Sequence, residues 1–223
     1  WISINVPSEN LEVLRSVMIL RGGEDPDAAT AIASSILDWK DNDDEPRENG
    51  AENDYYQALE PPYDSHNGLI DVAEELLLIK NVTPELLERI DPVLTVSGQG
   101  RVNINTAGRD VLAILAHSRG AIRADAYALA DKIIEHRLNG NAFVIGGRVE
   151  DMRDHIVKSL KSGIGLTEDQ EVVLRAMIDQ GLVTIRSTYF RGVSSGTVWG
   201  RGRADSELTF VMNRNSGEIV FWR

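Results

Sequence analysis

The sequence predicts an α+β fold, in which a helical body is followed by a small antiparallel sheet. Through most of the first 180 residues, apolar positions recur at spacings of three and four, which is the period of an amphipathic helix. After Gly181 the pattern changes to an alternation of apolar and polar residues, which is typical of strands. The two patterns follow one another along the chain, which favours segregated helices and strands over an alternating α/β arrangement.

The helical body contains two stretches that resemble each other. The first combines Leu11-Glu12-Val13-Leu14 with residues 32–40, and the second combines Arg109-Asp110-Val111-Leu112 with residues 129–137. Each stretch is predicted to form helix, turn and helix, with one apolar face buried. The repeat therefore divides the helical body into two units.

Capping residues mark three helix starts. They are Asp25 before Pro26, Thr83 before Pro84, and Thr167 with Gln170 three residues later as a capping box. The segment between the two repeats begins with an acidic loop. It continues through Glu60-Pro61-Pro62-Tyr63, which cannot continue a helix, and ends with two short predicted helices at 72–79 and 84–90. The last predicted helix covers 167–180.

The predicted strands cover the alternating residues 183–189 and 208–212. A turn at Asn213-Arg214-Asn215-Ser216-Gly217 then leads to a final strand at Ile219 to Trp222. This order predicts an antiparallel meander.

The acidic loop is the strongest candidate site. Seven carboxylates fall between Asp41 and Asp54, and Arg47 is the only cation among them. Calcium takes six to eight oxygen ligands and suits such a loop. The spacing resembles that of a helix-loop-helix calcium site, whose first, third, fifth and twelfth ligand positions would be Asp41, Asp43, Glu45 and Glu52. The sixth position of such a site needs glycine, but this chain has Pro46 there. We therefore infer a calcium site that does not have the helix-loop-helix fold. The alternative is a solvated run of charge.

Composition argues against other functions. A net charge of −12 disfavours binding to a phosphate backbone, and the absence of cysteine excludes disulfides, thiolate metal sites and cysteine nucleophiles. The four histidines lack ligand spacing, and no glycine-rich phosphate loop or serine nucleophile elbow is present. We therefore expect a protein that is not an enzyme. No apolar run approaches the roughly 20 residues that span a bilayer, so any signal or anchor is expected either upstream of Trp1 or not at all.

A helix-hairpin-helix nucleic-acid-binding protein is the alternative function. Val102-Asn103-Ile104-Asn105-Thr106-Ala107 and the helices that follow resemble that module, but His117-Ser118-Arg119-Gly120-Ala121-Ile122 replaces its glycine-hydrophobic-glycine hairpin. Together with the net charge, this substitution favours a helical packing unit.

A series of motifs resembles the general secretion pathway protein K family in order and in spacing. The motifs are Asp38-Trp39, Asp41, Asp43-Asp44, Gly50-Ala51-Glu52, Tyr55-Tyr56, Pro61-Pro62-Tyr63, Asn67, Glu74-Glu75-Leu76, Val102-Asn103-Ile104-Asn105-Thr106-Ala107, Ser187-Thr188-Tyr189-Phe190 and Val220-Phe221-Trp222-Arg223. The resemblance covers nearly the whole chain.

This resemblance implies a pilin-like antiparallel sheet, interrupted by an inserted region of two sterile-alpha-motif-like (SAM-like) helical units. The expected domains are residues 1–9 with 181–223 for the sheet, 10–97 for the first helical unit with the calcium loop, and 98–180 for the second. It also implies two structural Ca²⁺ ions. The ligands carried over are Asp41, Asp43, Asp44 and Glu52, with Glu48 and Asp54 as secondary candidates.

Family membership would make the chain a minor pseudopilin of type II secretion, located in the periplasm at the tip of the pseudopilus. The expected partners are the minor pseudopilins I and J, with pseudopilin H and secreted substrates as further candidates and no nucleic acid. Family members begin with an apolar spine helix anchored in the inner membrane, whereas this chain begins Trp1-Ile2-Ser3-Ile4-Asn5, so membrane contact is expected only through that helix.

Overall fold

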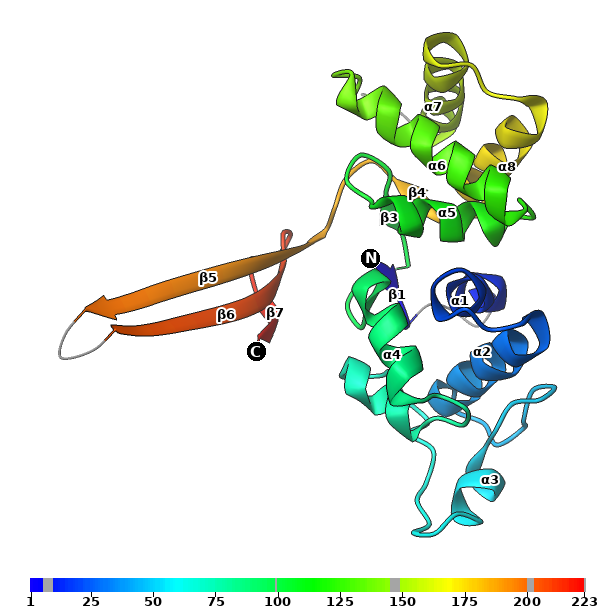
Figure 1. Ribbon diagram of the computed structural model, residues 1–223, viewed down its shortest axis with the longest axis vertical. Coiled ribbons are helices and arrows are strands. Elements are labelled where there is room, and N and C mark those ends of the chain that lie inside the picture. The colour runs from blue at the N-terminus through cyan, green and yellow to red at the C-terminus, as the bar shows by residue number, and fades with distance from the viewer. Residues whose placement is uncertain (6–9, 99, 145–148, 200–202, 223) are drawn as a thin grey trace. The chain divides into compact units, whose positions relative to one another are not determined.

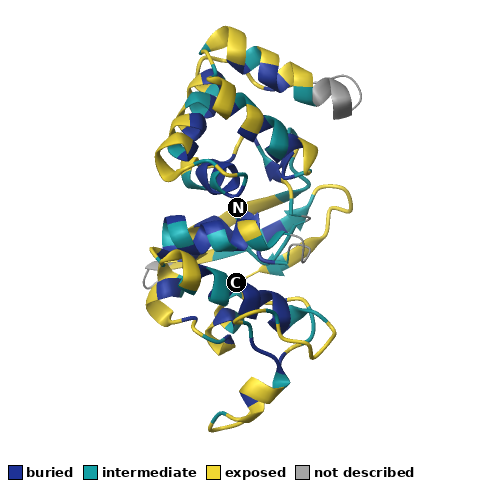
Figure 2. Cartoon of the chain, turned by 90° about the vertical axis from the view of Figure 1, so that its right-hand side faces the viewer, coloured by how far each residue is buried: buried dark blue, intermediate teal, exposed yellow. Residues whose placement is uncertain are grey.

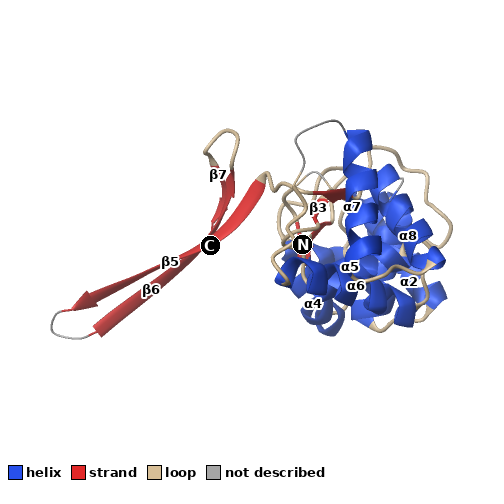
Figure 3. Ribbon diagram, turned by 90° about the horizontal axis from the view of Figure 1, so that it is seen from above, coloured by secondary structure: helices blue, strands red, loops and turns tan. Residues whose placement is uncertain are grey.

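The computed structural model describes residues 1–5, 10–98, 100–144, 149–199 and 203–222. They form two compact units, a helical unit (Trp1–Ile185) and a sheet unit (Arg186–Arg223). The α+β class predicted from the sequence is confirmed (Figures 1 and 3). No helix in these described ranges is long and apolar enough to cross a bilayer.

The first half of the helical unit contains the elements of the first repeat. They are β1 (Ile2–Ser3), α1 (Leu11–Val17), η2 (Met18–Gly22), α2 (Pro26–Lys40), α3 (Asn53–Gln57), η3 (Ala73–Leu78), α4 (Pro84–Ile90), η4 (Asp91–Val93) and β2 (Leu94–Thr95). Two predicted caps are confirmed. The Asp25 carboxylate accepts hydrogen bonds from the backbone at the start of α2, and the Thr83 hydroxyl caps α4.

The second half contains the second repeat. Its elements are β3 (Val102–Asn103), α5 (Arg109–His117), α6 (Arg123–Leu138), α7 (Val149–Gly163), α8 (Glu168–Asp179) and β4 (Val183–Thr184). The capping box of Thr167 and Gln170 at the start of α8 is confirmed. Helix α7, whose sequence carries no comparable capping signal, was not predicted.

Equivalent hydrogen bonds, as well as equivalent helices, occur in each of the two repeats. The Asn5 side chain bonds the main chain of Ile70 and the carbonyl of Val96, and Asn105 bonds Phe143 and Ile185 in the same way. The ends of the aligned helices match too, since Lys40 donates to the carbonyl of Ile4 and Arg137 to that of Ile104. The duplication inferred from the sequence therefore extends to side-chain contacts that close each repeat.

Short parallel strands close each repeat, and they change the predicted boundaries. Strand β1 pairs with β2, and β3 pairs with β4. Residues 1–9 were expected to join the C-terminal sheet, but the described residues 2–3 pair within the helical unit; residues 6–9 lie outside the described residues. The predicted strand 183–189 is divided, because Val183 is buried beside β3 while the sheet unit begins after Ile185.

The core of the helical unit comes from the faces predicted by the helical period (Figure 2). Leu14, Ile36, Leu112 and Ile133 have no exposed surface, and they come from α1, α2, α5 and α6. Burial of one such side chain contributes about 1.5–3 kcal/mol. The packed core thus fixes the C-terminal end of α2, where the acidic loop begins.

The sheet unit is the predicted antiparallel meander. Strands β5 (Tyr189–Trp199), β6 (Arg203–Asn213) and β7 (Ile219–Trp222) pair in sequence order. The turn before β7 closes through a hydrogen bond of 2.8 Å from the Gly217 amide to the Asn213 carbonyl. The ring of Phe210 on the neighbouring strand lies over Gly192, in the space that a side chain at this position would occupy.

Candidate metal centre

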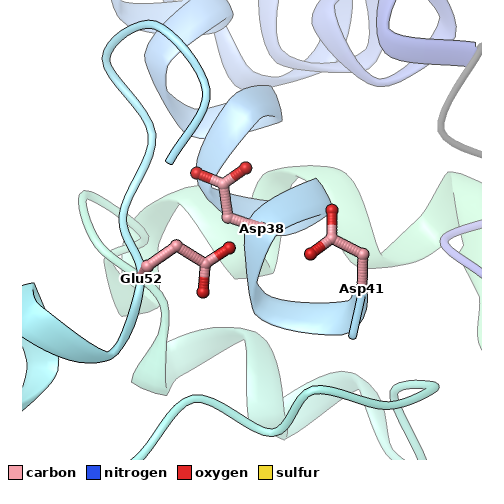
Figure 4. Close-up of side chains that lie close together, drawn as sticks. All are labelled: Asp38, Asp41 and Glu52. Carbon is pink, nitrogen blue, oxygen red and sulfur yellow. The ribbon is translucent and has the colours of Figure 1, made fainter. Parts of the chain in front are cut away.

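Three carboxylates meet where α2 ends and α3 begins. Asp38 and Asp41 are three residues apart at the end of α2, which puts them on one side of the helix, and Glu52 directly precedes α3. An oxygen from each of the three lies within 4.8 Å of the other two. Figure 4 shows the side chains pointing toward one another.

Burial makes this acidic cluster costly without a counter-charge. Asp38 is 0% exposed and Glu52 is 3% exposed. Within the described ranges, Asp41 Oδ1 and both oxygens of Glu52 are buried and have no hydrogen-bond partner. Buried polar atoms are nearly always satisfied in proteins, so these three oxygens are the part of the cluster best suited to act as ligands for a cation.

Electrostatics support the same conclusion. Burial, together with the charges of Asp38, Asp41, Asp44 and Asp43, raises the pKa of Glu52 to about 7. Burial also raises the pKa of Asp38, although hydrogen bonds from Arg47 and Ala51 oppose that rise. Because the C-terminal end of α2 carries the negative end of the helix dipole, it adds to the negative potential.

The donor set fits a hard cation. The cluster offers carboxylate oxygens, which Ca²⁺ and Mg²⁺ prefer, and it contains neither histidine nor cysteine, which structural zinc sites use. The surrounding loop is irregular, which suits the flexible coordination of Ca²⁺ better than the strict octahedron of Mg²⁺.

The loop is held against the end of α2 by contacts that depend on its sequence. The Ala51 amide donates to Asp38 Oδ2 at 2.8 Å, and a side chain at Gly50 would collide with the same carboxylate. The Lys80 ammonium donates to the carbonyl of Gly50 at 3.0 Å, and its nitrogen lies 5.0 Å from the centre of the Tyr55 ring. Gly50 therefore serves close approach to Asp38 rather than the turn that a helix-loop-helix site would need.

The structure brings together two of the six predicted metal residues, Asp41 and Glu52. Asp43 and Asp44 are exposed; Asp43 accepts the Glu45 amide and Asp44 accepts the Asn53 side chain. Their charges still act on Glu52. Glu48 and Asp54 are exposed.

Asp38 was missing from the predicted metal residues. The sequence did contain a signal for it, because the spacing of three to Asp41 at a helix end places two carboxylates side by side.

The hairpin of the helix-hairpin-helix-like segment packs against the first repeat. Nδ1 of His117 lies 2.8 Å from the Ser16 hydroxyl, and Arg123 donates to the carbonyl of Ile19 at 2.9 Å. Ser16 is fully buried. These contacts favour the packing role that the sequence indicated for this segment.

Comparison with known proteins adds a family to this description. Residues 5–99 match the family model for type II secretion system (T2SS), protein K. A putative type II secretion system protein K of Escherichia coli K12 is 34% identical over 90 residues, which are 40% of this chain and 28% of that protein. The type II secretion system protein K of Pectobacterium carotovorum subsp. carotovorum is 37% identical over 87 residues, 38% of this chain and 26% of that protein. The chain therefore matches less than a third of the length of either relative.

A solved structure shares the fold over nearly the whole chain. It is a chain of the GspK-GspI-GspJ complex from the type 2 secretion system of enterotoxigenic Escherichia coli, with a TM-score of 0.65 and 16% identity. The match covers 97% of this chain and 70% of that chain.

The fold and the acidic cluster define an α+β protein with a duplicated helical unit, a terminal antiparallel sheet and a buried carboxylate centre. The resemblance predicted from the sequence motifs is confirmed, and residues 5–99 match protein K of the type II secretion system.

Proposed function

We propose that this chain is the periplasmic part of a minor pseudopilin of type II secretion, which caps the tip of the pseudopilus and is anchored in the inner membrane by an N-terminal helix. The observation that carries the proposal is the match of residues 5–99 to protein K, together with a fold shared along 97% of the chain with a chain of the GspK-GspI-GspJ complex. The role is one of assembly rather than catalysis. The helical repeats are the SAM-like units, and they precede the strands of the pilin-like sheet.

The partners of this proposal are the minor pseudopilins I and J, with H and secreted substrates in contact with the assembled tip. The test is co-expression of the chain with pseudopilins I and J of the same genome, followed by size-exclusion chromatography. A ternary complex is expected. Elution of the chain apart from an I–J pair, over a range of concentrations, would contradict this role.

We further propose that Ca²⁺ stabilises the fold at the acidic cluster. Asp41 and Glu52 are ligands, with Asp38 beside them. The proposal rests on the buried, unpartnered oxygens of Asp41 and Glu52. Asp43, Asp44, Glu48 and Asp54, which are exposed on the same loop and its neighbouring helix, are candidates for a second ion.

Metal analysis and thermal unfolding test the calcium proposal. The purified chain is expected to contain calcium, and a chelator is expected to lower its melting temperature, because a ligand that binds only the folded state raises stability. A Glu52→Gln variant should lose this response. A Glu88→Gln variant, which removes an exposed carboxylate of α4, should keep it. An unchanged melting temperature in chelator and no bound calcium would refute the assignment.

A further inference from the structure

Arg47 is the cationic side chain of the acidic cluster. Its Nη1 atom donates to Asp38 Oδ1 at 2.6 Å and to Asp41 Oδ2 at 2.5 Å. Its backbone amide also donates to the Asp38 carboxylate. Arg47 thus bonds two of the three carboxylates through its side chain, and one of them, Asp38, through its main chain as well.

The oxygens of the cluster are divided between two groups. Arg47 and the Ala51 amide satisfy both oxygens of Asp38 and one oxygen of Asp41. The unpartnered oxygens are Asp41 Oδ1 and both oxygens of Glu52. A cation bound to the unpartnered oxygens would leave the contacts of Arg47 intact, so the guanidinium and the metal share the cluster rather than compete for it.

The charge of the cluster depends on this arginine. The three carboxylates and one guanidinium carry two net negative charges, which one divalent cation neutralises. Without the guanidinium the same carboxylates would carry three charges. Arginine stays charged at any physiological pH, so the contribution of the guanidinium to this balance is permanent.

We propose that Arg47 is a positioning residue that also sets the valence preference of this centre, favouring divalent over trivalent cations. The inference rests on the proposed calcium site. Removing one positive charge a few ångströms from a bound cation favours a trivalent ion over a divalent one by about tenfold or more at the effective dielectric constant of a protein surface. Lys40, Asp43 and Asp44 are present in the parent and in the variants. Burial and then the charge of Arg47 lower the pKa of Lys40 to about 8, so the titrations are performed at a pH well below that value, where Lys40 is charged in every variant.

The test is isothermal titration of the chelator-treated chain with Ca²⁺ and with La³⁺. The measured quantity is the ratio of the La³⁺ to the Ca²⁺ association constant. Arg47→Gln is expected to raise this ratio by about tenfold or more, and Arg47→Lys, which keeps the charge, by less than about threefold. Arg89→Gln is the matched control, because it removes a positive charge that pairs with Glu24 on the surface; it should leave the ratio unchanged.

A role in positioning alone would weaken both ions by the same factor, so an unchanged ratio in Arg47→Gln would overturn the proposal. Should Arg47→Gln fail to fold, Asn42→Lys provides the reverse test. This exposed position directly follows Asp41, and an added ammonium group should lower the ratio by at least about twofold at low ionic strength. No decrease would equally overturn the proposal.

The two proposals fail in different ways. If the parent binds neither ion, or if Glu52→Gln leaves calcium affinity unchanged, the calcium site is wrong and the role of Arg47 falls with it. If calcium binds through Glu52 but the ratio does not respond to charge, only the role of Arg47 is wrong.

Discussion

Replacement of Glu52 by glutamine should change stability in a way that depends on calcium. In chelator, the parent must bury a carboxylate whose pKa is raised from 4.5 to about 7, chiefly by burial. A shift of that size corresponds to about 3 kcal/mol of destabilisation once the group is ionised. The neutral amide avoids this cost, so we expect Glu52→Gln to be more stable than the parent in chelator by up to about 3 kcal/mol above pH 7.

The effect of pH in chelator follows from the same shift. A raised pKa in the folded state means that the stability contributed by the protonated group is lost as pH rises from about 4.5 through about 7. The parent should therefore lose stability over this range, whereas Glu52→Gln should lack this component of the pH dependence.

Calcium should offset the advantage of the glutamine. At a calcium concentration about a hundredfold above the dissociation constant, the parent gains about 2.7 kcal/mol, or about 5–10 °C in melting temperature for a chain of this size. The variant lacks the buried charge that would bind the ion and should show little of this gain. Urea unfolding followed by circular dichroism, in chelator and in calcium, measures both effects. A variant that is less stable than the parent in chelator, or that responds to calcium as the parent does, would refute the reasoning.

Three further substitutions test contacts within the helical unit. Asn105→Ala should lower the urea midpoint by an amount equivalent to about 2–4 kcal/mol, since three main-chain hydrogen bonds are lost at about 1 kcal/mol each; an effect below about 1 kcal/mol would contradict the closing role of this residue. Gly50→Ala should weaken calcium binding measured by titration, because its methyl group would displace the Asp38 carboxylate; unchanged affinity would show that the loop adjusts freely. Glu75→Gln should reduce stability near pH 7 and have progressively less effect as pH falls. Burial raises the pKa of Glu75, but hydrogen bonds, first among them that from Trp39, outweigh this and lower it, so the contribution is present above the unfolded pKa and lost in acid; a pH-independent difference in thermal unfolding would contradict this.

Local signals explain which features could be predicted from the sequence. Caps such as Asp25 and Thr83 act on backbone amides two or three residues away, so their effect can be read within a short window. Strands β1 to β4 contain two residues each, too few to show an alternating pattern, and their pairing joins residues far apart in the chain.

The carboxylate centre was predicted incompletely because it too depends on contacts between residues that are not adjacent in the sequence. The density of acidic residues indicates a cation, but the identity of the buried ligands depends on how the loop folds back. The spacing of three between Asp38 and Asp41 places these two carboxylates together, but the main-chain contacts of Arg47 and Ala51 that bury Asp38 have no signature in the sequence. The spacing that suggested Asp43 as a ligand assumes a continuous calcium loop, whereas the end of α2 supplies two of the three carboxylates here.

Among the described residues only the first repeat carries an acidic centre, and the connection that follows its second helix explains why. In both repeats the asparagine that closes the unit bonds the chain after the second helix, but the path from Lys40 to Ile70 is much longer than that from Arg137 to Phe143. In the second repeat the ring of Phe143 stacks on that of His136, the counterpart of Trp39, with the ring centres 5.0 Å apart. The longer connection in the first repeat contains the acidic loop and α3.

A long irregular connection costs more closure entropy than a short one, and this one also carries mutually repelling carboxylates. A cation bound by Asp41 and Glu52 would join the start of the connection to a point near its middle, shorten the free loop and reduce the repulsion. With the proposed cation, the centre would act as a structural staple for an insertion that the second repeat lacks. A catalytic role would instead require an open coordination position facing a substrate pocket, whereas Asp38 and Glu52 are almost fully buried between the loop and the end of α2.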